Sequence, residues 1–469
     1  MQYPEKTKAL FFNIVLFIIF LFSILLIVKP LYDIFVINTG HSINQYYLYF
    51  LFIFISLTLP ALVAIFQDKR KLNIFLMLTV NIFCLYSFEI FLELKNILGY
   101  DLIGKAKKEA IKLNIDFDNR SRIDILDSLS NAGFNAHEPV GPGHLFCNIK
   151  YRDGFVTTND ERIFPLGGIS KSFTTFDNSN GYYPIIALDK YGFNNQKEIY
   201  DLNNIDVALI GDSFTEGFSV NPDQSISGRM NRLGINTISL GKGGNGPLTE
   251  LATLIEYCSI FQPKVIIWLY CSNDLEFWNL PIELNSTILL KYLNDKNYSQ
   301  GLIRRQNEID SLMIKYLNDA KKEYKVVANT RSSALQSIKE IVTLWNFRSF
   351  LIIDNRYEDT INWTTPFKEF ELILTRAKET VNNWDGKLIF LYLPDYQEYV
   401  KPFESNLSKQ EVLDIVRRLD IPIIDGKKDI FDMHNTPLSL FPFGLDLHFN
   451  KDGYKLLTDG IIENLTNKD

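Results

Sequence analysis

The apolar positions of the chain follow more than one pattern. In the first quarter they form long continuous stretches at residues 10–28, 46–66 and 72–94. Each stretch is long enough to cross a hydrocarbon core about 30 Å thick, so the pattern predicts three transmembrane helices within a membrane anchor over residues 1–95. The alternative is a signal peptide followed by buried core helices, but the first stretch is too long for such a peptide and lacks a small-residue cleavage site.

From residue 205 onward, short apolar runs alternate with amphipathic segments. Runs of this length are typical of buried parallel strands, and their alternation with helices predicts a parallel sheet that is covered on both faces. We therefore expect an α/β three-layer sandwich over residues 205–469. The predicted strands lie at residues 207–210, 237–240, 265–270 and 388–393, with 421–424 as a candidate fifth.

Two segments have less regular patterns. Residues 96–204 are charged at first and then rich in Gly, Pro, Asn and aromatic residues, which favours a juxtamembrane connector followed by a small irregular β region. An insertion at about residues 279–363 is mostly helical in pattern. Two roles are open for this insertion: a cover over the ligand-binding edge of the sheet, or a structural addition.

The positive charges around the predicted spans indicate an orientation. Residues 67–71 form a concentrated basic loop and Lys6 and Lys8 precede the first span, whereas residues 29–45 carry little positive charge. Basic loops stay in the cytoplasm, so three crossings place everything after residue 94 in the periplasm or outside the cell. We expect a multi-pass protein of the bacterial inner (cytoplasmic) membrane.

Composition excludes several classes of partner and site. The 469 residues include 48 Lys and Arg against 55 Asp and Glu, a net charge of −7. This balance gives no broad cationic surface, so no nucleic-acid partner is expected. The four cysteines are far apart, with no CxxC pair and no metal-like Cys/His spacing. The sequence therefore predicts no disulfide scaffold and no metal site.

The stretch DVALIGDSFTEGFSV, residues 206–220, raises the question of chemistry. Ser213 follows the first predicted strand and precedes a helix start, so it should lie at the sheet edge where ligands bind in α/β folds. The plain alternative is a strand, a turn and a helix cap, with Ser213 satisfying only backbone donors.

Three further motifs fall at comparable places. SLGKGGNGPL, residues 239–248, offers glycines whose amides can approach a ligand closely. Asn273 follows the apolar run 265–270 and can supply an amide donor, while Asp446 and His448 precede a helix-like segment near the C-terminus. Together with Ser213 these are the parts that acyl transfer requires: a hydroxyl nucleophile, a base and oxyanion donors.

This combination resembles the SGNH (GDSL-type) hydrolase superfamily. GDSFTEG is similar to its serine block, GKGGNG to its glycine block, SNDL to its asparagine block and DLHFNKDGY to its Asp/His block, and the resemblance covers residues 206 to about 465. It implies a flavodoxin-like α/β fold in which Ser213 is the nucleophile and His448 the general base. It also implies an oxyanion hole formed by the amides of Ser213 and Gly244 and the side chain of Asn273.

The chain departs from the family pattern at two places. Ser272 stands where a glycine usually precedes the asparagine, and Leu445 occupies the usual position of the acid, three residues before the histidine. Asp446, two residues before His448, is then the expected orienting acid, a spacing similar to that of some glycan O-acetyltransferase relatives. The neighbouring glycines Gly241, Gly243 and Gly246 are alternatives to Gly244.

The expected function is a membrane-anchored serine esterase. It would hydrolyse an O-acyl ester of an envelope glycan or lipid outside the cytoplasm, with no metal or organic cofactor. One alternative is an O-acyltransferase that modifies a cell-surface glycan, for which three spans are few, so that a membrane partner for acyl transfer would be needed. The other is a binding module that has lost turnover, although the presence of Ser213, Asn273 and His448 together argues against it.

Overall fold

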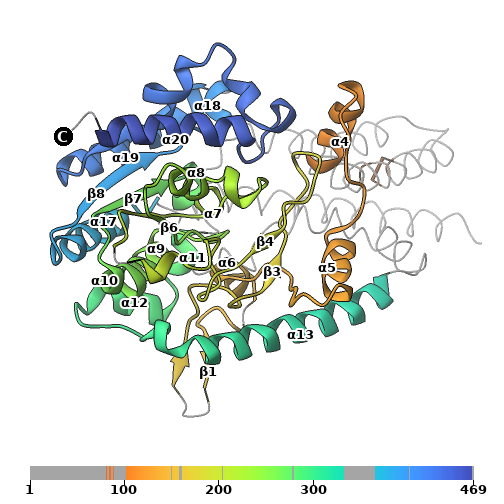
Figure 1. Cartoon of the computed structure of the whole chain (residues 1–469), viewed down its shortest axis with the longest axis horizontal. Coiled ribbons are helices and arrows are strands. Elements are labelled where there is room, and N and C mark those ends of the chain that lie inside the picture. The colour runs from red at the N-terminus through yellow and green to blue at the C-terminus, as the bar shows by residue number, and fades with distance from the viewer. Residues whose placement is uncertain are drawn as a thin grey trace, which may run out of the picture. The chain divides into compact units, whose positions relative to one another are not determined.

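The computed structural model describes residues 102–331 and 365–466, apart from 149, 158–160, 203, 277–278 and 401, together with residues 81, 84, 85 and 88. The chain divides into two compact units, one of residues 1–100 and 329–364 and one of residues 101–328 and 365–469. Nearly all described residues belong to the second unit, which is coloured in Figure 1.

The predicted membrane anchor over residues 1–95 falls almost entirely outside the described residues. This holds for the three predicted spans, 10–28, 46–66 and 72–94, except for the four single residues named above. Within the described part of the chain, no helix combines the length and the apolar character needed to cross a membrane.

A five-stranded parallel sheet forms the centre of the second unit, as the sequence pattern predicts. The strands lie in the order β6-β5-β7-β8-β9. The first strand in the chain, β5, has β6 on one side, and the later strands β7, β8 and β9 are added on its other side, so the order of strands reverses between β5 and β7. This order is flavodoxin-like, and the reversal marks the place where such sheets bind ligands. The strands are β5 (Val207–Ile210), β6 (Thr237–Ser239), β7 (Val265–Tyr270), β8 (Lys387–Tyr392) and β9 (Ile423–Asp425).

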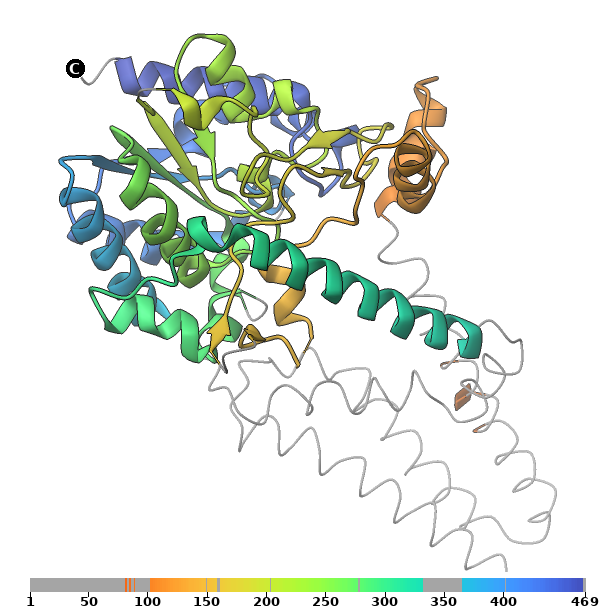
Figure 2. The same cartoon turned by 60° about the horizontal axis from the view of Figure 1, so that its bottom comes forward.

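Alternate residues of each strand enter two separate hydrophobic cores. Ala208, Ile266 and Phe390 pack in one core, while their neighbours Leu209 and Ile267 pack in the other. Because successive side chains of a strand point to opposite faces, both faces of the sheet need covering. Figures 1 and 2 show the sheet between two groups of helices, which confirms the predicted three-layer sandwich.

The first face is covered by helices from the middle of the chain. The core includes Leu248 and Leu251 of α9, Leu289 of α12 (Thr287–Asn294), Ile373 of α17 and Val416 of α19. The helices of this part are α9 (Pro247–Thr253), η5 (Leu254–Cys258), α10 (Ser259–Phe261), η6 (Ser272–Leu275), α17 (Phe367–Asn382), α18 (Gln397–Val400) and α19 (Pro402–Arg418).

The second face is covered mainly by α8 and the C-terminal helix α20. Met230 of α8 and Leu457 and Ile461 of α20 pack in its core. The helices of this part are α7 (Ser213–Glu216), η4 (Pro222–Gln224), α8 (Ile226–Arg232), η8 (Gly426–Ile430), η9 (Phe431–Met433), η10 (Pro437–Leu440), η11 (Pro442–Gly444) and α20 (Lys451–Thr466).

The described residues before the sheet pack onto the same unit. Phe146, Phe164 and Phe193 are buried in the first core with the sheet residues, and two short antiparallel pairs, β1 with β2 and β3 with β4, lie in this segment. Its elements are α4 (Leu102–Lys112), α5 (Arg122–Asn131), α6 (Pro142–Phe146), β1 (Phe155–Val156), β2 (Arg162–Ile163), β3 (Phe173–Thr174), β4 (Ile186–Ala187) and η3 (Ile199–Asp201).

Two asparagine side chains occupy the outer edge of β6. Asn195 accepts a hydrogen bond from the Ser239 amide at 2.7 Å and donates one to the Ser239 carbonyl at 2.8 Å. Asn231 makes the same pair of bonds with Thr237, at 2.7 and 2.8 Å. A carboxamide has one acceptor and one donor group, so each asparagine satisfies both backbone groups of one residue.

The described part of the insertion, residues 279–331, is helical and packs against the segment before the sheet. Phe164 donates its amide hydrogen to Gln300 at 2.7 Å, and Tyr316 donates its hydroxyl hydrogen to the His144 carbonyl at 2.9 Å. These helices are α11 (Leu280–Glu283), α12 (Thr287–Asn294), η7 (Leu302–Arg305) and α13 (Gln306–Arg331).

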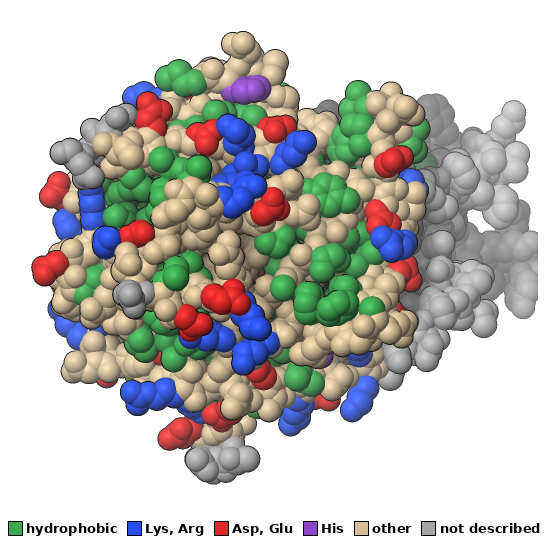
Figure 3. Space-filling view, in the orientation of Figure 1, with side chains coloured by type: hydrophobic (Ala, Val, Ile, Leu, Met, Phe, Trp, Pro, Cys, Tyr) green, Lys and Arg blue, Asp and Glu red, His purple; other side chains and the backbone are tan. Residues whose placement is uncertain are grey.

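The face drawn in Figure 3 has intermixed basic and acidic side chains. The expectation that nucleic acid is no partner stays a prediction.

Candidate active site

Ser213 lies three residues beyond β5, in a turn that leaves little space. Gly211 lacks a side chain where one is not tolerated, because an added Cβ would lie 2.8 Å from the Leu269 carbonyl oxygen and would overlap Thr215. Asp212 caps the following short helix by accepting the Phe214 amide hydrogen at 2.9 Å. The turn thus presents Ser213 at the carboxyl edge of the sheet, as the sequence predicts.

His448 is hydrogen-bonded to Ser213. Its Nε2 lies 2.7 Å from Ser213 Oγ, although the two residues are 235 positions apart. The imidazole ring packs against two aromatic rings, with centroid distances of 4.7 Å to Phe214 and 4.9 Å to Phe218. Helix α20 is fixed to the serine turn by the Tyr454 hydroxyl, which donates to the Phe214 carbonyl at 3.2 Å.

Burial lowers the pKa of His448 below its usual value of 6.5, and the charge of Asp177 opposes that shift by raising it. A neutral imidazole is the form that can accept the proton of a serine hydroxyl. The Ser213–His448 pair therefore has both the geometry and the protonation state of a nucleophile with its base.

Asp446 is not hydrogen-bonded to His448 in the described structure. Its carboxylate accepts a hydrogen bond from the Gln397 side chain instead. Burial raises the pKa of Asp446, with Gln397 lowering it and the charge of Asp395 raising it further. The structure thus brings Ser213 and His448 together and places Asp446 beside Gln397.

Asp177 was not singled out by the sequence. Its Oδ1 accepts hydrogen bonds from the hydroxyls of Ser179 and Ser219, both at 2.8 Å, and Ser219 follows the serine turn directly. The preceding residue, Phe176, stacks on Phe218 with ring centroids 4.0 Å apart. The Asp177 segment is therefore fixed to the same aromatic residue that packs against His448, and no motif spacing signals this contact.

In the glycine block, the amides of Gly241 and Gly244 form no hydrogen bond with any described residue. The Gly243 amide donates to Glu216 at 2.8 Å and the Gly246 amide donates to Glu283 at 2.7 Å. Gly244 has a φ of +77°, in the left-handed region that glycine adopts without strain. Gly244 and its alternative Gly241 are therefore the glycines of this block with an amide to spare for an oxyanion.

A buried ion pair fixes the glycine block to the serine turn. Lys242 pairs with Glu216, and both side chains are nearly fully buried. Glu216 also accepts the Gly243 amide hydrogen. No pattern in the sequence predicts this pair, although Glu216 lies within GDSFTEG and Lys242 within GKGGNG, and opposite charges in two such blocks are a usable signal.

Asn273 lies in the turn η6 that follows β7. Its carbonyl accepts a hydrogen bond from the Asn279 side chain at 2.7 Å, while its side-chain Oδ1 is buried without a hydrogen-bond partner among the described residues. The next residue, Asp274, accepts the Cys271 amide hydrogen at 2.9 Å. Asp274 therefore stabilises the turn, and the side chain of Asn273 forms no hydrogen bond with the described residues.

Buried carboxylates hold the turns of the site. Asp212, Asp274 and Glu283 each accept backbone amide hydrogens of one block. Burial raises the pKa of Asp212 and that of Glu283, each to about 7. No group of three or more His, Cys, Asp or Glu side chains in the described part of the chain has an arrangement that could hold a metal ion.

Comparison with known proteins gives matches only among solved structures. No protein-family model matches the sequence, and no curated protein matches it. A lipase/acylhydrolase from Enterococcus faecalis is similar over 56% of this chain and 96% of its own, with 14% identity and a TM-score of 0.31. The acetyl xylan esterase AlAXEase is similar over 55% of this chain and 99% of its own, with 12% identity and a TM-score of 0.31. The esterase EstA from a Pseudoalteromonas species is similar over 56% of this chain and 98% of its own, with 10% identity and a TM-score of 0.28.

Proposed function

We propose that this chain is a serine hydrolase of the SGNH type, which cleaves an ester through an acyl intermediate on Ser213. One observation carries the proposal: Ser213 Oγ and His448 Nε2 are 2.7 Å apart. The pKa of His448 is lowered by burial, so the imidazole is neutral near pH 7 and can act as a general base.

In the first half of the reaction, the proton of Ser213 Oγ passes to His448 Nε2 as Oγ attacks the ester carbonyl carbon. The carbonyl oxygen becomes an oxyanion, for which the expected donors are the amides of Ser213 and Gly244 and the side chain of Asn273. The bond to the alcohol then breaks, and His448 returns the proton to the leaving oxygen.

In the second half, a water molecule attacks the acyl carbon of acyl-Ser213. His448 accepts a proton from the water, the same donors hold the second oxyanion, and the bond to Ser213 Oγ breaks. Oγ regains the proton from His448, and a carboxylic acid leaves. An acyltransferase would replace the water with a sugar hydroxyl at this step.

We further propose that the enzyme is anchored in the bacterial inner membrane and acts outside the cytoplasm. The proposal is supported by the three predicted spans and the basic loop at residues 67–71. An O-acyl ester of an envelope glycan or lipid would then be the substrate, because the site would face that compartment.

Labelling with a fluorophosphonate probe tests the function. The probe should modify the wild-type protein, and peptide mass spectrometry should locate it on Ser213; Ser213→Ala should abolish labelling and the cleavage of p-nitrophenyl acetate. Ser311→Ala, at an exposed serine on α13, is the matched control and should label as the wild type does. Full labelling or full ester cleavage by Ser213→Ala would rule out the proposed nucleophile.

A labelled acyl donor separates hydrolysis from transfer. Loss of the acyl group from Ser213 only when a sugar is added would indicate transfer in place of hydrolysis.

A further inference from the structure

Ser272 stands where the SGNH hydrolases, which this sequence resembles, usually have a glycine. Its side chain forms a specific contact. Its hydroxyl donates a hydrogen bond to the carboxylate of Asp395. Strands β7 and β8 are parallel neighbours with Tyr270 opposite Tyr392. Ser272 follows β7 by two residues and Asp395 follows β8 by three, so the two chain segments leave the same sheet edge side by side.

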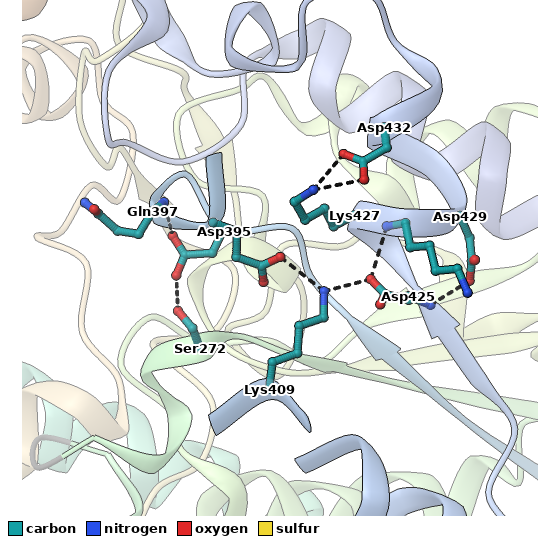
Figure 4. Close-up of polar contacts among 10 residues, drawn as sticks. Ser272, Asp395, Gln397, Lys409, Asp425, Lys427, Asp429 and Asp432 are labelled. Atoms are coloured by element: carbon teal, nitrogen blue, oxygen red, sulfur yellow. Dashed lines mark hydrogen bonds and ion pairs between the residues drawn. The ribbon is translucent and has the colours of Figure 1, made fainter. Parts of the chain in front are cut away.

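The second oxygen of Asp395 is also occupied. Oδ1 accepts the Gln397 amide hydrogen at 2.8 Å, and Figure 4 shows Ser272 and Gln397 on two sides of the Asp395 carboxylate. The Gln397 side chain in turn donates to Asp446. Hydrogen bonds therefore connect the turn that carries Asn273 to the loop that carries His448.

Asp395 has no ion pair with any described residue. The nearby lysines are used elsewhere: Lys409 pairs with Glu398 and Asp425, as Figure 4 shows for Asp425. A carboxylate that is not neutralised by a cation forms stronger hydrogen bonds with neutral donors than a neutral acceptor does. The bond from Ser272 is thus a charge-assisted constraint on the turn.

The position of Asn273 depends on that constraint. Its side chain is not held by a hydrogen bond at Oδ1 among the described residues, so its direction is set by the backbone of η6. An oxyanion donor must lie about 2.7–3.1 Å from the developing charge, and a displacement of about 1 Å can cost about a hundredfold in rate. The residue that fixes the preceding Ser272 is therefore in a position to control the rate.

We propose that Asp395 is a positioning residue for the oxyanion donor Asn273 and acts through the hydroxyl of Ser272. The inference rests on the proposed function and deepens it. It explains how the chain functions with a serine at a glycine position: the added hydroxyl is used to tie the asparagine turn to the neighbouring strand end.

Steady-state hydrolysis of p-nitrophenyl acetate tests the proposal. Asp395→Asn and Ser272→Ala should each lower kcat about tenfold, a fraction of the cost of losing an oxyanion donor, and leave KM unchanged, because the lost interaction acts only in the transition state. The double variant should be no slower than the slower single one, since both substitutions act on the same charge-assisted bond: Ser272→Ala removes its donor, and Asp395→Asn replaces the charged acceptor with a neutral one. Asp432→Asn is the matched control: this aspartate pairs with Lys427, outside the Ser272 network, and should keep the wild-type kcat.

The background of Asn273→Ala separates positioning from general damage to the fold. Once the donor is absent, Asp395→Asn should lower kcat less than twofold further. A further tenfold loss there, a raised KM with unchanged kcat, or full activity of both single variants would each overturn the inference. Fluorophosphonate labelling of Ser213 reports separately on the proposed function, so a wild type that neither labels nor cleaves the ester would refute both.

Discussion

At the residue scale, two influences set the proton affinity of His448. Burial lowers its pKa and the charge of Asp177 raises it. Asp446, the acid that the family resemblance implies, is hydrogen-bonded to Gln397 in this structure. The carboxylate that acts electrostatically on the imidazole is therefore Asp177.

We predict that Asp177→Asn shifts the pH dependence of kcat/KM. A nearby negative charge stabilises the protonated imidazole, so its removal should lower the pKa of His448 further and move the midpoint of the rising limb to lower pH. Asp446→Asn should leave the midpoint unchanged. The measurement is kcat/KM for p-nitrophenyl acetate from pH 4.5 to 8. A shift in Asp446→Asn and none in Asp177→Asn would identify Asp446 as the carboxylate that serves His448.

At the scale of elements, the turns of the site share a buried acidic centre. Asp212, Asp274 and Glu283 cap three different turns, and Glu250 of α9 is fully buried with them. Burial, followed by the charges of Asp274, Asp212 and Glu283, raises the pKa of Glu250 well above its usual value. Glu250 forms no ion pair with the described residues.

Glu250→Gln should therefore stabilise the protein in a pH-dependent way. A carboxyl whose pKa is raised in the folded state binds its proton more tightly there than in the unfolded chain, so its contribution to stability is full below about pH 4.5 and is lost as the pH rises through the folded pKa. Glutamine is neutral and removes that loss. The difference in free energy of unfolding should be near zero at pH 4.5 and grow towards pH 8, by up to about 1.4 kcal/mol per pH unit.

Urea unfolding at pH 4.5, 6 and 8 measures this difference. Glu463→Gln, at an exposed position of α20, is the control and should not differ from the wild type. A constant difference between Glu250→Gln and the wild type at all three values would contradict the electrostatic explanation.

The sheet could be predicted from the sequence, because strands that are buried on both faces of a parallel sheet consist of short apolar runs. The predicted run at 265–270 coincides with β7, and the run at 388–393 is offset from β8 by one residue. Ser213 and His448 were also found by their motifs. The contacts of Asp177, Asp395 and Gln397 could not be predicted, because they join separate segments through side chains in turns, where no periodicity or spacing marks a partner.

At the scale of the whole molecule, the predicted topology can be tested on intact cells. Met433 is 77% exposed, so Met433→Cys in a background that lacks the exposed Cys84 and Cys147 should react with a membrane-impermeant maleimide in outer-membrane-permeabilised cells. A cysteine at Gln67, in the loop predicted to be cytoplasmic, should react only after lysis. The reverse pattern of labelling would overturn the predicted orientation.

The two asparagines at the outer edge of β6 also bear on how this chain can be shortened. Asn231 belongs to α8, but Asn195 lies before the first strand of the sheet. A fragment that begins at residue 205 would keep every residue of the candidate site except Asp177 and would lack Asn195. The amide and carbonyl of Ser239 would then be unpaired at the end of the sheet, where they form a template for a strand of another copy. We therefore expect such a fragment to self-associate, and a soluble shortened form of the chain to need residues before the sheet.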